Sequence, residues 1–145
     1  MARWSYLTGM RESNMLALKL SAACEAGVTY TPVKARKNKP AVPILIEWSD
    51  ELRSVWRLAA GMRIGAQPLF PTTSGGFYSR DSFQSLWQRW RKRVGIEDLR
   101  WHDIRRKAGS DSDSDATATD LLAHSDGAVT RKHYRVKPHA VKPLK

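Results

Sequence analysis

The stretch LRWHDIRRKAGSDSDSDATATDLLAHSDGAVTRKHY spans residues 99–134. It contains two pairs of polar side chains whose spacing in the sequence suggests that they lie close together. His102 and Arg105 are three positions apart, which on a helix makes them neighbours on one face, with Cβ atoms about 5–6 Å apart. Such a pair can grip a small anion from one side. His124 and Tyr134 are separated by a Ser-Asp-Gly turn between two short helical segments. That reversal can bring the Tyr134 hydroxyl back towards the first pair.

Three motifs in this stretch resemble boxes of the tyrosine recombinase (phage integrase) catalytic domain. Residues 102–105 (HDIR) are similar to the family's H-x-x-R box, and residues 121–125 (LLAHS) to its L-G-H-S/T box. Residues 130–134 (TRKHY) are similar to the segment that carries the nucleophilic tyrosine. Order and spacing match as well. Ala123 stands where glycine is usual, so we expect a mild effect if its φ is negative and a strained turn if φ is positive.

A fourth motif lies near the start of the chain. Residues 8–11 (TGMR) are similar to the family's T-G-L/M-R box, and the resemblance makes Arg11 its first catalytic arginine. The apolar spacing of residues 13–20 predicts a short helix directly after it. Asn14 stands where the family usually has Glu or Asp. A carboxylate there orients the arginine or supports the fold, so Asn14 is a departure from the pattern.

Two apolar segments, residues 27–34 and 41–48, have the composition of strands in a hairpin with a basic turn. The resemblance implies a catalytic lysine at the end of the first strand of such a hairpin, and Lys34 is the best match. Lys37 and Lys39 remain alternatives because the length of the turn is ambiguous. The basic side chains of the turn are also expected to contact DNA phosphates: Arg36, Lys37 and Lys39.

Two further helices are predicted before the H-x-x-R box. Residues 49–60 begin with Ser49 as N-cap and acidic residues in the first turn, and we interpret this helix as structural. Residues 82–94 form an amphipathic helix that Gly95 ends, and its aromatic face is expected to be core rather than a base-stacking surface. That face holds Phe83, Leu86, Trp87 and Trp90. The cations expected to contact DNA backbone, here and on the next helix, are Arg89, Arg91, Lys92, Arg93, Arg106 and Lys107.

Composition narrows the class of protein. The chain has 145 residues, with 25 Lys+Arg against 14 Asp+Glu and a formal net charge of +11, which favours a polyanionic partner such as nucleic acid. Cys24 is the only cysteine, which excludes a disulfide framework. The four histidines lack metal-ligand spacing, so neither a metal nor another cofactor is expected. There is no membrane-length apolar run, and we expect a cytoplasmic protein of phage or prophage origin acting in a bacterial host.

The resemblance also implies a reaction. Arg11 and Arg105 would clamp the non-bridging oxygens of a DNA phosphodiester, since guanidinium forks match phosphate geometry. Tyr134 would attack the phosphorus and form a 3′-phosphotyrosyl link, while Lys34 would protonate the departing 5′ oxygen. The histidines of the two boxes would hydrogen-bond the phosphate or assist proton movement. On this interpretation Arg105→Ala removes cleavage and leaves the fold intact.

These observations predict a mostly helical α+β domain with a small antiparallel sheet, the tyrosine recombinase catalytic-domain fold. We expect residues 1–145 to be this catalytic domain without the core-binding and arm-binding domains that precede it in integrases. Residues 136–145 would form a C-terminal tail. The expected partners are double-stranded DNA at attachment sites and other copies of the chain, joined through that tail. Two alternatives stay open: a non-catalytic DNA-binding remnant of an integrase, and a type IB topoisomerase-like strand transferase.

Overall fold

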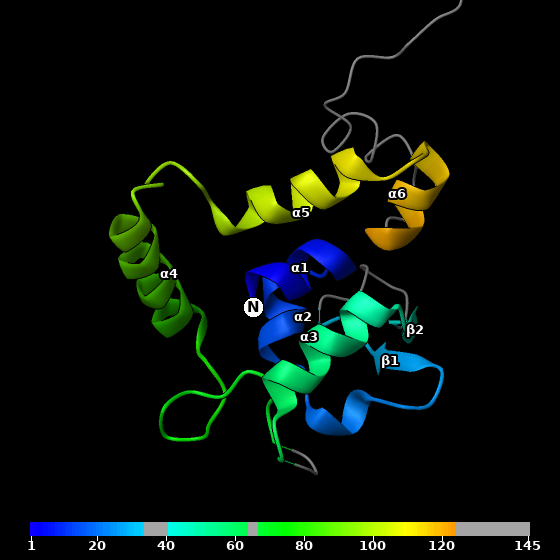
Figure 1. Cartoon of the computed structure of the whole chain (residues 1–145), viewed down its shortest axis with the longest axis horizontal. Helices are drawn as coiled ribbons and strands as arrows, with labels where there is room; N and C mark the ends of the chain where they lie inside the picture. Colours follow the sequence, from blue (N-terminus) through cyan, green and yellow to red (C-terminus); the bar gives the residue numbers. More distant parts are fainter. Residues whose placement is uncertain (34–40, 64–66, 124–145) are drawn as a thin grey trace, which may run out of the picture.

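The computed structural model describes residues 1–33, 41–63 and 67–123, and it is mostly helical with one small sheet (Figure 1). This confirms the expected fold class. No helix within these residues is both long and apolar enough to cross a bilayer. In chain order the elements are α1 (Ala2–Thr8), α2 (Glu12–Leu16), the 3₁₀ helix η1 (Leu20–Ala22), β1 (Gly27–Tyr30), β2 (Ile44–Glu47), α3 (Asp50–Ala60), α4 (Arg80–Val94), α5 (Trp101–Asp111) and α6 (Asp115–Leu121).

The two strands form the expected antiparallel pair, with Gly27 opposite Glu47 and Tyr30 opposite Ile44. Both are shorter than the apolar segments that predicted them. Gly27 is required at the pairing edge, because a Cβ there would lie 2.1 Å from the carbonyl oxygen of Ile46. The sheet therefore starts where a residue without a side chain allows the two backbones to approach.

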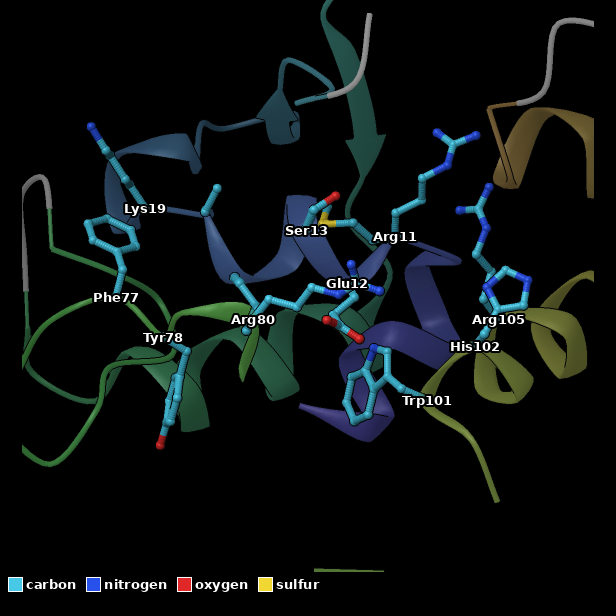
Figure 2. Close-up of a pocket in the computed structure, with 13 residues that line it drawn as sticks. Arg11, Glu12, Ser13, Lys19, Phe77, Tyr78, Arg80, Trp101, His102 and Arg105 are labelled. Atoms are coloured by element: carbon cyan, nitrogen blue, oxygen red, sulfur yellow. The ribbon is translucent and has the colours of Figure 1, made fainter. Parts of the chain in front are cut away.

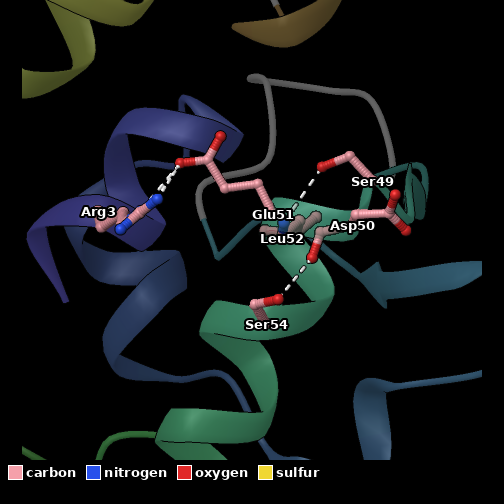
Figure 3. Close-up of polar contacts among 6 residues, drawn as sticks. All are labelled: Arg3, Ser49, Asp50, Glu51, Leu52 and Ser54. Atoms are coloured by element: carbon pink, nitrogen blue, oxygen red, sulfur yellow. Dashed lines mark hydrogen bonds and ion pairs between the residues drawn. The ribbon is translucent and has the colours of Figure 1, made fainter.

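Serine caps define where α3 and α4 begin. The Ser49 hydroxyl accepts a hydrogen bond from the Leu52 N–H at 3.1 Å, which satisfies one of the donors at the start of α3 (Figure 3). Ser79 does the same for α4, so this helix starts two residues before the predicted one. It ends as expected at Gly95, whose φ of 73° is left-handed.

Helix α2 is shorter than its apolar spacing predicts. It ends at Leu16, because the following backbone pairs with a distant segment instead of continuing the helix. Leu18 accepts from the Leu69 N–H at 2.8 Å, and the Leu20 N–H donates to the Gln67 carbonyl at 2.9 Å. Tertiary hydrogen bonds thus replace the helical ones that local spacing favours.

Aromatic side chains connect the helices in the core. The fully buried Trp4 of α1 packs against Trp56, with ring centroids 5.6 Å apart, and α1 lies between α5 and α3 (Figure 1). Between α4 and α5, Trp101 meets Phe83 and Trp87 edge to face. The predicted core face of α4 is therefore mostly correct. Trp90 departs from this face, because it stacks on Trp87 but is 44% exposed.

Candidate active site

A tight corner between α1 and α2 positions Arg11. Gly9 ends α1 with a left-handed φ of 57°, a conformation that glycine adopts without strain. Thr8 fixes the corner from the other side: its hydroxyl donates to the Trp4 carbonyl at 2.8 Å and accepts from the Met10 N–H at 3.2 Å. Arg11 follows as the N-cap of α2, with extended backbone. The TGMR motif therefore forms a fixed turn that ends in a half-buried arginine.

The first turn of α5 presents His102 and Arg105. The Arg100 N–H donates to the Asp103 carboxylate at 2.8 Å, so the second residue of the HDIR motif anchors the start of the helix. Trp101 points into the core, which turns His102 outwards and Arg105 back under the helix. The spacing of this motif thus gives two side chains from one helix, one exposed and one buried.

Arg105 connects three motifs that are far apart in sequence. Its side chain is only 4% exposed, and its guanidinium donates to the carbonyls of Gly9 and Leu122, the latter at 2.5 Å. These acceptors are 96 and 17 residues away in sequence. Gly9 itself packs on the end of α6, where a Cβ would lie 3.1 Å from Leu121. The two carbonyl bonds fix the plane of the guanidinium, as a preorganised anion-binding group requires.

The departure at Ala123 produces backbone strain. Ala123 has a φ of 47°, and it is the sole non-glycine residue with positive φ in the part of the chain that the structure describes. An L-residue in this left-handed region costs about 1–2 kcal/mol. Of the two outcomes expected for this position, the strained turn is the one observed. It lies directly after Leu122, whose carbonyl Arg105 holds.

Arg11, His102 and Arg105 line one groove with a volume of about 820 Å³, and Figure 2 shows the three side chains together at one end of it. Burial and the nearby Arg105 guanidinium lower the pKa of His102 below its ordinary 6.5. The imidazole is therefore neutral at pH 7 and can donate or accept a proton. No cluster of three potential metal ligands occurs among residues 1–33, 41–63 and 67–123.

Asn14 has a defined role at the position where a carboxylate was expected. It is buried, and its side-chain oxygen accepts from the Val33 N–H at 2.9 Å. A neutral amide here ties α2 to the end of the first strand without adding a negative charge near Arg11. The substitution therefore keeps the supporting function through hydrogen bonding alone.

The predicted surface cations differ in their surroundings. Arg91 is half-buried and donates to the Glu97 and Leu99 carbonyls, the latter at 3.0 Å, so it supports the connection from α4 to α5. Arg106 lies 3.9 Å from Asp103 in an exposed ion pair. The other cations predicted on these helices are exposed: Arg89, Lys92, Arg93 and Lys107. Six predicted site residues lie outside the described residues: Lys34, Arg36, Lys37, Lys39, His124 and Tyr134.

Sequence reasoning missed the far half of the groove. Its lining includes Lys19, Phe77, Tyr78 and Arg80, and Glu12 lies on the same wall. No motif links these residues, because they come from two segments, 12–19 and 77–80, that are far apart in the sequence. Burial raises the pKa of Glu12, and its carboxylate accepts from the Gln84 amide at 2.6 Å.

The family model described as "Phage integrase family" matches residues 1–139. The chain belongs to the phage integrase family. This confirms the resemblance carried by the four motifs. No curated protein matches the chain.

Solved recombinases share the fold of this integrase domain. The crystal structure of XerA recombinase has a TM-score of 0.67 at 16% identity, covering 92% of this chain and 50% of that one. The Tn1549 transposon integrase in complex with circular intermediate DNA has a TM-score of 0.71 at 16% identity, over 97% and 53%. The crystal structure of a lambda integrase dimer bound to a COC′ core site has a TM-score of 0.71 at 16% identity, covering 99% of this chain and 44% of that one. The chain thus spans about half the length of these proteins.

Proposed function

We propose that this integrase domain cleaves a DNA strand through a 3′-phosphotyrosyl intermediate and rejoins it, the strand transfer of site-specific recombination. One observation carries the proposal. Arg105, which lines the groove with Arg11 and His102, is buried and joins the H-x-x-R motif to the TGMR corner and to the start of the LLAHS motif through the Gly9 and Leu122 carbonyls. This arrangement supports an anion site to which three motifs contribute, with the arginine already oriented.

Each step of the proposed reaction is assigned to a particular side chain. Arg11 and Arg105 hold the non-bridging oxygens of the phosphodiester, and loss of one such preorganised donor costs about 3–4 kcal/mol of transition-state stabilisation. The Tyr134 oxygen forms a bond to phosphorus, and the bond from phosphorus to the 5′ oxygen breaks. The phenol proton leaves to water or to the neutral His102 imidazole. Lys34 gives a proton to the 5′ oxygen, with Lys37 and Lys39 as the other candidates.

The phosphate binding is proposed to need neither metal nor ATP. The guanidinium groups supply the positive charge that a metal would supply, and the phosphotyrosyl bond keeps the energy of the broken phosphodiester. His124, the histidine of the LLAHS motif, hydrogen-bonds the phosphate or assists proton movement, as His102 does. Reversal of the first step onto the 5′ hydroxyl of another strand completes recombination.

The proposed partners are double-stranded DNA at attachment sites and further copies of this chain. Support for DNA comes from the net charge of +11 and from the Tn1549 and lambda integrase structures, both bound to DNA. Support for self-association comes from the lambda integrase, which is a dimer on its core site. We propose residues 136–145 as the segment that joins neighbouring copies.

Covalent trapping tests the reaction. The protein is incubated without metal with duplex DNA carrying a 5′-bridging phosphorothiolate, whose sulfur leaves irreversibly, and the products are separated on a denaturing gel. We expect a slow-migrating adduct with the native chain and none with Tyr134→Phe. A native chain that binds the DNA but forms no adduct contradicts the proposal and favours the non-catalytic remnant.

A further inference from the structure

The groove extends well past the three residues of the proposed phosphate site. At about 820 Å³ it lies at the upper end of the range for ligand pockets, about 300–1,000 Å³. A single phosphate between Arg11 and Arg105 fills only one end of it. Figure 2 shows Lys19 and Phe77 at the opposite end of the groove from these arginines. The far end is therefore a separate part of the same surface, with its own side chains.

Positive charge continues along the groove. Arg80 extends across its middle towards Glu12, and Lys19 lies beyond it (Figure 2). Neither cation is in an ion pair within residues 1–33, 41–63 and 67–123; the salt bridges there involve Arg3, Arg106 and Lys107. Both side chains are exposed. Their charge is thus available to a ligand lying in the groove.

The backbone beneath the far end is fixed although the side chains are exposed. Lys19 forms an isolated bridge with Pro68, and the neighbouring hydrogen bonds from Leu20 and Leu69 hold this segment on both sides. Arg80 is the first residue of α4, directly after the Ser79 cap. Two cations on fixed backbone can define a spacing between two anionic groups.

An exposed aromatic ring lies beside Lys19 at the far end of the groove (Figure 2). Phe77 is 45% exposed, whereas its neighbour Tyr78 is half-buried and packs edge to face on Phe83. An exposed ring beside cations fits a ligand that alternates charged groups with apolar rings. The sugar-phosphate backbone of DNA has this alternation, with one phosphate every 3.4 Å of rise along a strand.

Glu12 limits which ligand fits. Its carboxylate is directed at the Gln84 amide and lies near the Arg80 guanidinium, which offsets part of its charge. A single phosphate has little to gain at this point, but a chain of phosphates can pass it with contacts on both sides. The charge pattern therefore favours an extended polyanion over a small anion.

We propose that Lys19 and Arg80 bind the DNA backbone next to the cleaved phosphate, on the same strand, with Phe77 packing against a deoxyribose beside the phosphate that Lys19 contacts. This inference rests on the proposed function, because the cleaved phosphate defines one end of the stretch of DNA strand that lies in the groove. It adds two phosphate contacts and one apolar contact that no sequence motif marks. The groove then orients the strand along its length, while the arginines hold the reacting group.

Salt dependence of DNA binding tests the proposal. Affinity for a duplex is measured by fluorescence anisotropy from 50 to 200 mM salt, in a Tyr134→Phe background so that binding stays reversible. The salt slope is the steepness with which the logarithm of the binding constant falls against the logarithm of the salt concentration, and loss of one phosphate contact lowers it by about 0.9. Between 50 and 200 mM salt, the fold-loss of affinity is therefore about 3.5 times smaller for Lys19→Ala, and likewise for Arg80→Ala, than for the parent protein. For the double variant this fold-loss is about 12 times smaller. Phe77→Ala weakens binding without changing the slope.

Two controls separate charge position from charge alone. Arg80→Lys keeps the charge, and we expect the slope of the parent protein. Arg57→Ala removes an exposed arginine from α3, outside the groove, and should leave the slope unchanged. Slopes for Lys19→Ala and Arg80→Ala equal to that of Arg57→Ala overturn the inference, and so does a lack of measurable binding at 50 mM salt.

The trapping experiment is run in parallel on the protein that keeps Tyr134. Reduced slopes together with no covalent adduct leave the groove assignment standing and contradict the proposed chemistry. An adduct together with unchanged slopes supports the chemistry and overturns the groove assignment. The two proposals therefore fail on different measurements.

Discussion

Arg105→Ala is expected to destabilise the fold as well as remove a catalytic cation. The substitution deletes the donors to the Gly9 and Leu122 carbonyls, both in the buried junction of α1, α5 and α6. A hydrogen bond from a charged donor contributes about 1.5–3 kcal/mol, so two bonds amount to about 3–6 kcal/mol. Removal of the buried guanidinium also removes its desolvation cost, which offsets part of this loss.

The net expectation is a loss of about 3 kcal/mol, a large share of the about 5–15 kcal/mol that stabilises a typical domain. This replaces the expectation from sequence that Arg105→Ala leaves the fold intact. Urea unfolding followed by circular dichroism measures the change in the free energy of unfolding. The free energy of unfolding of Arg105→Lys is expected to fall between those of the native chain and Arg105→Ala, since one ammonium group cannot reproduce the planar fork of the guanidinium.

Arg11→Ala is the matched control. It removes the same charge from the same groove, but the Arg11 side chain is half-buried and makes no hydrogen bond among the described residues. We expect it to change stability by less than about 0.5 kcal/mol. If Arg105→Ala and Arg11→Ala unfold at the same urea concentration, the two carbonyl bonds do not support the fold and the reasoning is refuted.

Two further predictions follow from the same region. Ala123→Gly relieves the positive φ and, after the greater entropy of glycine in the unfolded chain, should stabilise the domain by about 0.5–1 kcal/mol, or roughly 2–3 °C in Tm. Ala118→Gly, inside α6, should instead lower the Tm, and a fall for both variants would contradict the strain. Because the pKa of His102 is lowered in the folded state, the unfolded chain binds more protons between that pKa and 6.5. Stability should therefore rise with pH across this window and level off above it, and His102→Gln should show a shallower rise in urea unfolding; an unchanged pH profile would exclude the lowered pKa.

Sequence reasoning succeeded where interactions are local. Ser49 at the start of α3 and Gly95 at the end of α4 act on backbone groups within one helical turn, so their residue types alone predict the boundaries. The aromatic stripe of α4 follows the same logic, since helical periodicity selects one face. Periodicity does not say which positions of that face another element covers, and Trp90 on the same stripe is exposed.

Four motifs in order are enough to identify a phage integrase without any knowledge of contacts. Contacts in the folded chain were needed to show that Arg105 is buried and bonded to two carbonyls, and that Lys19 and Arg80 share the groove with Arg11. Both findings depend on segments far apart in the sequence meeting in space, and the sign of φ at Ala123 likewise came from the structure. Hydrogen bonding and burial act through distance in the folded chain, and sequence spacing does not encode that distance.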